Sequence, residues 1–157
     1  MRAVVLIPAR YASSRYPGKP LVPLYGKPMV LWVAELSSKA VGKENVYIAT
    51  EDSRIAEAVN TAGYNAVMTS DTCLTGTDRL AEAALQIKAD IYINVQGDEP
   101  IINPDDILKA IKVKQQDMSS IVNGYCWLSE FENPESKNIP KVITNEDNTL
   151  VYMSRNA

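Results

Sequence analysis

In the stretch Ala3-Val-Val-Leu-Ile-Pro-Ala-Arg-Tyr-Ala-Ser-Ser-Arg-Tyr-Pro-Gly-Lys19, an apolar run ends at Pro8 and a basic loop follows directly. The run 3–7 predicts a buried strand. The loop after it carries three cations and two hydroxyls, from Arg10, Ser13, Ser14, Arg15 and Lys19. Ligands of open α/β sheets bind outside the carboxyl ends of the strands. This position favours a site for a polyanion such as a nucleoside triphosphate over the alternative of a solvated basic loop.

Apolar runs and helical patterns alternate along the rest of the chain. Strands are predicted at 46–50, 65–68, 91–95 and 121–128, and helices at 29–39, 53–62, 77–88 and 104–116. This alternation is typical of βαβ units in an α/β fold with a mainly parallel sheet. Two further strands, 141–144 and 149–154, flank a hairpin turn and would make the sheet mixed. Because no linker interrupts the pattern, we expect one domain over residues 1–157.

The composition limits the chemistry. The 157 residues include no histidine, which excludes a Ser-His-Asp triad, a histidine base and any zinc site with a histidine ligand. The two cysteines, Cys73 and Cys126, are too few for a four-cysteine zinc site, and without a secretory signal we expect reduced thiols. A bound metal would therefore be a hard cation such as Mg²⁺, held by carboxylates.

Charge is unevenly distributed over the chain. Residues 1–43 hold seven basic residues and one acid, giving +6, whereas the remainder carries −9. A local basic segment on an acidic protein favours a small anionic ligand over duplex nucleic acid. No apolar run approaches the roughly 20 residues of a membrane helix, and no leader pattern opens the chain. We expect a cytoplasmic protein with no membrane partner.

A second motif, Asn94-Val-Gln-Gly-Asp-Glu-Pro100, ends the predicted strand 91–95 in polar residues. A carboxylate at this edge of the sheet suits Mg²⁺ that is shared with a triphosphate. The alternative is a charged turn. Asp98 beside Arg10 and Lys19 would complete an assembly of cations, metal and phosphate.

A third motif, Thr75-Gly-Thr-Asp-Arg79, precedes the predicted helix 77–88, for which Thr77 is the expected N-cap. Arg79 in the first turn opposes the helix dipole, which indicates a specific anionic or carbonyl partner. An ordinary capped surface helix is the alternative.

Taken together, these segments resemble the 3-deoxy-manno-octulosonate (Kdo) cytidylyltransferase family from residue 1 to 157. The resemblance rests on 7–21, Gly26-Lys-Pro-Met29, Ala49-Thr50, Met68-Thr69, Gly76-Thr-Asp-Arg-Leu-Ala-Glu82 and Asn94–Pro100. It implies a nucleotide-diphospho-sugar transferase-like, three-layer α/β/α fold, with CTP, Mg²⁺, a 2-keto sugar acid and a second copy of the chain as partners.

The resemblance also implies roles for particular residues. It places the triphosphate at Arg10, Ser13, Arg15 and Lys19, and the cytosine at Pro8, Ala9, Thr69 and Arg79. Gln96 would lie near both the nucleotide and the sugar acid, and Asp98 would bind Mg²⁺. We expect Arg10, Lys19 and Asp98 to be the catalytic residues.

The expected reaction transfers a cytidylyl group from CTP to Kdo and releases pyrophosphate, for lipopolysaccharide biosynthesis. Members of the family continue well beyond Ser154-Arg155, into a region that holds much of the sugar pocket. Two alternatives therefore stay open: a catalytically inactive CTP-binding module, and transfer to another sugar acid of the sialic or 8-amino type.

Overall fold

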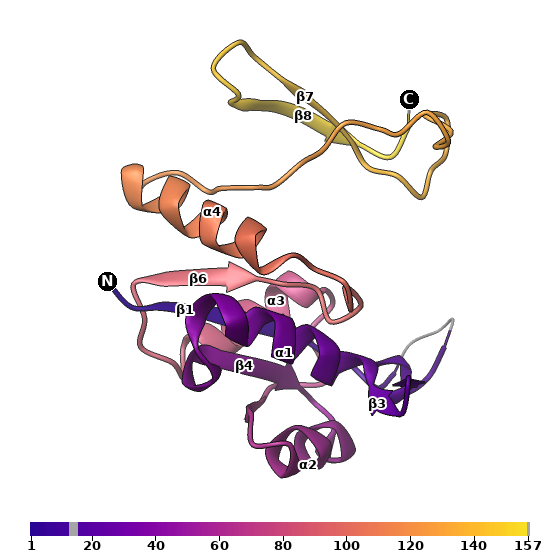
Figure 1. Ribbon diagram of the computed structural model, residues 1–157, viewed down its shortest axis with the longest axis vertical. Coiled ribbons are helices and arrows are strands. Elements are labelled where there is room, and N and C mark those ends of the chain that lie inside the picture. The colour runs from indigo at the N-terminus through magenta and orange to yellow at the C-terminus, as the bar shows by residue number, and fades with distance from the viewer. Residues whose placement is uncertain (13–15, 157) are drawn as a thin grey trace. The chain divides into compact units, whose positions relative to one another are not determined.

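The computed structural model describes residues 1–12 and 16–156 (Figure 1). Ser13 and Arg15, both predicted to bind the nucleotide, lie outside the described residues. The larger elements are β1 (Ala3–Pro8), α1 (Met29–Val41), β4 (Val46–Thr50), α2 (Ser53–Thr61), β5 (Asn65–Met68), α3 (Gly76–Ala84), β6 (Ile91–Asn94), α4 (Pro104–Gln116), β7 (Lys141–Thr144) and β8 (Leu150–Ser154). Two short strands, β2 (Pro23–Leu24) and β3 (Lys27–Pro28), form a hairpin, and the short 3₁₀ turns are Lys19–Leu21 and Lys43–Asn45.

The central sheet has four parallel strands in the order β5-β4-β1-β6. The chain moves outward from β1 to β4 and β5, and then crosses to β6 on the other side of β1. The strand order therefore reverses between β1 and β6. In open α/β sheets, ligands bind at such a topological switch point, at the carboxyl ends of the strands.

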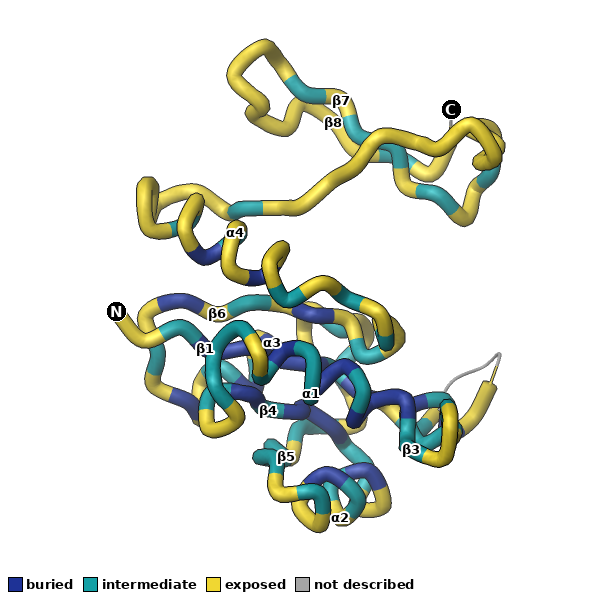
Figure 2. The backbone as a smooth tube through the Cα atoms, viewed as in Figure 1, coloured by how far each residue is buried: buried dark blue, intermediate teal, exposed yellow. Residues whose placement is uncertain are grey.

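Alternate side chains of β1 are buried on opposite faces of the sheet. Val5 and Ile7 pack in a cluster with buried residues of α1, α2 and α4. Val4 and Leu6 pack against α3 on the other face. Burial on both faces explains why β1 is a continuous apolar run, and Figure 2 shows its middle in dark blue together with most of β4 and part of α1. The predicted three-layer α/β arrangement is confirmed.

Two of the predicted strand assignments differ from the structure. Strands β7 and β8 pair with each other in a separate antiparallel sheet, so the predicted mixing does not occur in the four-stranded sheet. The predicted strand 121–128 is wrong, since those residues form no helix or strand. An apolar run becomes a strand only where another strand pairs with it, and Trp127 in this run is 90% exposed.

The chain divides into two compact units, residues 1–122 and 123–157. The buried core that the sequence predicts lies within the first unit. In the second, none of the described residues 123–156 is buried, and Val151 and Tyr152 of β8 are more than half exposed (Figure 2). A single domain over 1–157 stays a prediction. Over the described part of the chain, no helix has both the length and the apolar character needed to cross a bilayer.

Helix boundaries follow local capping chemistry. Asp52 is the N-cap of α2 and accepts a hydrogen bond from the Arg54 backbone N–H at 2.9 Å. Gly63, which follows this helix, has φ 76°, a conformation that suits glycine at a helix end. Helix α4 spans Pro104–Gln116 as predicted.

We expect Asp52→Asn to lower the stability at neutral pH by about 0.5 kcal/mol, the scale of a charge at a helix N-terminus. The hydrogen bond from the Arg54 side chain lowers the pKa of Asp52. A carboxyl group whose pKa is lower in the folded protein than in the unfolded chain stabilises the fold at pH values above its unfolded pKa of about 3.9. This contribution is lost as the pH falls through the pKa of the folded state. Asparagine keeps the cap without the charge. In urea unfolding, the stability difference between Asp52→Asn and the wild type should be smaller at about pH 3, below the unfolded pKa, than at about pH 7; an equal difference at both would contradict the charge argument.

Candidate functional site

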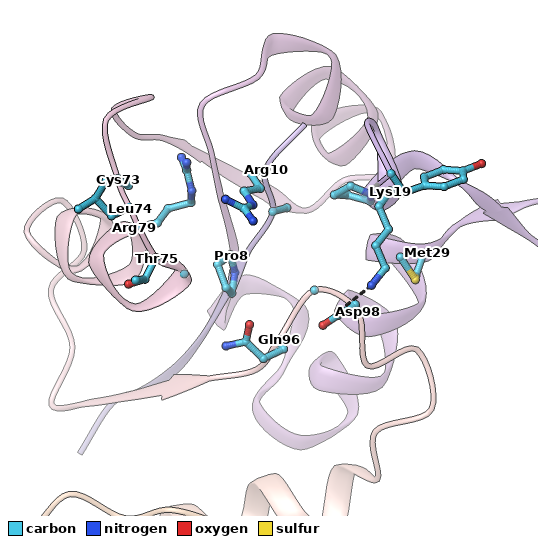
Figure 3. A pocket seen from close by; sticks show the side chains of 15 residues that line it. Pro8, Arg10, Lys19, Met29, Cys73, Leu74, Thr75, Arg79, Gln96 and Asp98 are labelled. Carbon is cyan, nitrogen blue, oxygen red and sulfur yellow. Dashed lines mark hydrogen bonds and ion pairs between the residues drawn. The ribbon is translucent and has the colours of Figure 1, made fainter. Parts of the chain in front are cut away.

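A pocket of about 520 Å³ opens beside the carboxyl ends of β1 and β6, a volume in the usual range for small-molecule sites (Figure 3). The loop after β1, the start of α1, the segment 73–79 and the loop after β6 form its walls. The lining residues are Pro8, Ala9, Arg10, Tyr16, Lys19, Pro20, Met29, Cys73, Leu74, Thr75, Gly76, Arg79, Gln96, Gly97 and Asp98.

Most of the residues selected from the sequence line this one pocket. They are Pro8, Ala9, Arg10, Lys19, Arg79, Gln96 and Asp98. Thr69 is not among the lining residues; its hydroxyl instead accepts a hydrogen bond from Arg79. The structure thus brings together segments that are far apart in the sequence, while the individual binding roles stay predictions.

The basic loop and the acidic loop meet across the pocket. Lys19 Nζ lies 2.7 Å from Asp98 Oδ2, and the two side chains are 45% and 51% exposed (Figure 3). An ion pair this exposed contributes little to stability. Both groups are therefore available to a ligand that carries phosphates or a divalent cation.

Gly97 lets the loop after β6 lie directly against the end of β1. A Cβ at this position would be 2.7 Å from the carbonyl oxygen of Pro8, well inside contact distance. The close approach fixes the neighbouring residues Gln96 and Asp98 at the pocket wall.

We expect Gly97→Ala to destabilise the protein by about 1–3 kcal/mol, because the backbone at Pro8 must move to admit the methyl group. At roughly 2–4 °C per kcal/mol, thermal unfolding should show a clear decrease in Tm. Gly124→Ala is the matched control, since a Cβ there meets nothing within 4 Å. Equal Tm changes in the two variants would contradict the close-contact argument.

The N-terminus of α3 faces the pocket through Thr75 and Gly76. Thr75, not the predicted Thr77, is the N-cap, and it forms a capping box with Asp78. The helix begins earlier than predicted because the Thr75 and Asp78 side chains satisfy each other's backbone N–H groups. This helix end adds partial positive charge to a pocket that is also lined by Arg10 and Lys19.

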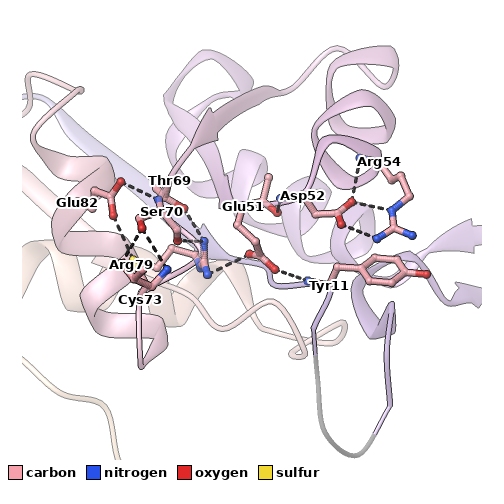
Figure 4. Close-up of polar contacts among 11 residues, drawn as sticks. Tyr11, Glu51, Asp52, Arg54, Thr69, Ser70, Cys73, Arg79 and Glu82 are labelled. Atoms are coloured by element: carbon pink, nitrogen blue, oxygen red, sulfur yellow. Dashed lines mark hydrogen bonds and ion pairs between the residues drawn. The ribbon is translucent and has the colours of Figure 1, made fainter.

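Arg79 is buried, with its side chain only 4% exposed. Its Nη1 donates to Thr69 Oγ1 at 2.5 Å and to the Ser70 carbonyl at 3.3 Å (Figure 4). Its Nη2 lies 3.0 Å from Glu51 Oε2, an ion pair without the alignment of a hydrogen bond. Arg79 therefore has both an anionic and a carbonyl partner, as its place in the first turn of α3 indicated, and both belong to the protein itself.

Sequence reasoning missed Glu51. This residue directly follows β4, its side chain is 15% exposed, and its Oε1 accepts a hydrogen bond from the Tyr11 backbone N–H at 2.9 Å (Figure 4). The rule that selected Arg10 and Asp98 also applies here, because Glu51 is a polar residue at the carboxyl end of a buried parallel strand.

Cys73 lines the pocket but is not an activated thiol. Its Sγ donates to Glu82 Oε2 at 3.1 Å. This hydrogen bond, with burial as a smaller cause, raises the pKa of Cys73. Because the thiolate is the nucleophilic form, Cys73 is unsuited to covalent catalysis at neutral pH.

Asp98 supplies a carboxylate that lines the pocket and could hold a divalent cation. Within residues 1–12 and 16–156, no group of three or more histidine, cysteine or acidic side chains is arranged to bind a metal. Mg²⁺ usually binds proteins through one or two carboxylates and completes its shell with water and substrate phosphates. The pocket fits Mg²⁺ that arrives with a phosphorylated ligand.

A parallel sheet whose strand order reverses beside a pocket with basic side chains is typical of nucleotide-binding α/β proteins. Residues 4–157 match the sequence profile of one group of such proteins, described as cytidylyltransferase. The chain belongs to the cytidylyltransferase family.

Relatives with specific activities are similar over nearly the whole chain. The 3-deoxy-manno-octulosonate cytidylyltransferase of Geobacter metallireducens is 46% identical, over 99% of this chain and 61% of the relative. The 8-amino-3,8-dideoxy-manno-octulosonate cytidylyltransferase of Shewanella piezotolerans is 41% identical, over 99% of this chain and 65% of the relative. The chain thus spans less than two thirds of the length of these relatives.

A solved structure is also similar. CMP:2-keto-3-deoxy-manno-octonic acid synthetase, in complex with CTP, superposes with a TM-score of 0.86 at 39% identity. The match covers 99% of this chain and 65% of that one. The predicted nucleotidyltransferase-like α/β fold is confirmed.

Proposed function

We propose that this chain forms the CTP-binding part of a cytidylyltransferase that activates a 3-deoxy-2-keto sugar acid, Kdo. The observation that carries the proposal is the pocket at the switch point of the sheet, where cations after β1 meet a carboxylate after β6. The names of the relatives and of the CTP-bound structure support the choice of nucleotide and sugar.

The pocket offers separate walls to the two ends of CTP. Arg10 and Lys19 would neutralise the β- and γ-phosphates that leave as pyrophosphate, and Ser13 and Arg15 are proposed to act in the same loop. The cytosine would lie by Pro8, Ala9, Thr69 and Arg79. Gln96 would contact the nucleotide where it meets the sugar acid.

In the proposed reaction, the 2-hydroxyl oxygen of Kdo bonds to the α-phosphorus of CTP while the bond to pyrophosphate breaks. The hydroxyl proton passes to solvent, and we assign no side-chain base. Mg²⁺ held by Asp98 would polarise phosphate oxygens and neutralise their charge. Catalysis by this chain's own residues then consists of positioning and charge stabilisation.

We propose that a homodimer carries out this reaction in the cytoplasm, as a step of lipopolysaccharide biosynthesis. A second acceptor, an 8-amino sugar acid, is favoured by the name of one group of relatives. A chain that binds CTP without transferring it is the third possibility, because these residues match only 61–65% of those relatives.

Calorimetry with CTP, UTP, ATP and GTP in the presence of Mg²⁺ tests the nucleotide. We expect CTP to bind most tightly, and equal affinity for all four would contradict the proposal. Pyrophosphate release with Kdo, 8-amino-Kdo and a sialic acid then identifies the acceptor. CTP binding without release for any acid would identify an inactive nucleotide-binding module.

A further inference from the structure

We infer that Glu51 is a positioning residue that joins two walls of the pocket, the phosphate wall with Arg10 and Lys19 and the base wall with Arg79. The cytosine and the phosphates of CTP are then bound at the same time. The inference rests on the proposed function, since it assigns those two parts of CTP to the two walls. Glu51 does not line the pocket, and its effect would be exerted through Tyr11 and Arg79.

On the phosphate side, Glu51 anchors the first residue of the loop after Arg10. Besides the hydrogen bond from its N–H to Glu51, Tyr11 accepts one through its carbonyl from the Gly18 N–H at 2.9 Å. The Arg54 guanidinium lies 3.4 Å from the centre of the Tyr11 ring. Tyr11 thus ties Gly18, the residue before Lys19, to the end of β4.

On the base side, the same carboxylate holds Arg79. The guanidinium joins α3 to Thr69 and Ser70, and Ser70 N–H in turn donates to Glu82 Oε1 at 2.8 Å. A continuous set of polar contacts therefore runs from Tyr11 through Glu51 to α3 (Figure 4). Because Arg79 and Glu51 are largely buried, their mutual attraction is screened less than that of a surface pair.

One carboxylate with a separate contact from each oxygen sets the distance between the walls. A preorganised spacing lowers the cost of binding a ligand that spans both walls, because the protein need not be ordered on binding. Ligands that touch one wall gain little from it. The inference therefore predicts an effect specific to CTP, in contrast to its fragments CMP and inorganic pyrophosphate.

The test compares Glu51→Asp and Glu51→Gln with Glu57→Gln, an exposed site on α2 that receives the same change. Aspartate keeps the charge beside Arg79 but is too short to maintain both contacts, so it tests the inference even where glutamine prevents folding. In calorimetry with Mg²⁺, we expect Glu51→Asp to weaken CTP binding on the order of tenfold, the scale of one hydrogen bond to a charged group. The affinities of Glu51→Asp for CMP and for pyrophosphate should change by less than about twofold. The affinity of Glu57→Gln for CTP should match that of the wild type.

Equal weakening of CTP and both fragments would indicate a merely structural role and overturn the inference, as would unchanged CTP binding. Hydrogen exchange at the Tyr11 amide is an independent readout that needs no nucleotide. It should accelerate in Glu51→Asp and stay unchanged in Glu57→Gln; unaltered exchange would overturn the anchor. A wild-type chain that does not prefer CTP would instead contradict the proposed function, and the exchange result would still decide whether Glu51 holds the loop.

Discussion

Arg79→Met is expected to lower the free energy of unfolding by about 3–5 kcal/mol, the usual cost of removing one partner from a buried ion pair. Methionine fills much of the space of the arginine stem but leaves Glu51 in a largely buried position without a counter-charge. The Thr69 hydroxyl and the Ser70 carbonyl lose their donor as well. Since folded domains are stable by only about 5–15 kcal/mol, the loss is a large share of the total.

Urea unfolding followed by circular dichroism measures this loss as a shift of the midpoint. Lys19→Met is the matched control, because it also removes a cation from an ion pair, in this case an exposed one. We expect the control to change stability by about 0–1 kcal/mol. Similar losses in the two variants would show that burial of the Arg79–Glu51 pair does not set its contribution.

The central elements were predictable because several local signals agree in each of them. Strand β4 and helix α4 have the predicted bounds: β4 is a short apolar run that lies between two helical patterns, and α4 begins at a proline after an asparagine cap. Where one signal stood alone, the prediction failed. The run 121–128 is apolar, but no strand pairs with it.

The outline of the pocket was predictable because the sheet topology brings its loops together. Parallel strands end at one edge of the sheet, so polar residues after β1 and β6 converge whatever the intervening sequence. The partner of Arg79 was not predictable in the same way. Its place in α3 indicated an anion, but only the side-by-side pairing of β4 with β1 and β5 places Glu51 within reach.

Asp98→Asn is expected to abolish the strengthening of CTP binding by Mg²⁺, a loss on the order of 100-fold in affinity, or about 2.7 kcal/mol. An amide has nearly the shape of the carboxylate but lacks the negative charge that makes a carboxylate a strong ligand for Mg²⁺. Without Mg²⁺, we expect the opposite change, an affinity of Asp98→Asn for CTP that is equal to or higher than that of the wild type. Asp98 now pairs with Lys19 at 2.7 Å, so its neutralisation frees that cation for phosphate and removes a repelling charge.

Calorimetry of CTP binding, with Mg²⁺ and with a chelator, separates these two effects. The variant should bind CTP at least as well as the wild type in the chelator and far more weakly in Mg²⁺. Asp106→Asn, an exposed site in the first turn of α4, is the control and should keep the full response to Mg²⁺. If Asp98→Asn weakens binding equally under both conditions, the carboxylate acts in the shape of the pocket and not as a ligand for the metal.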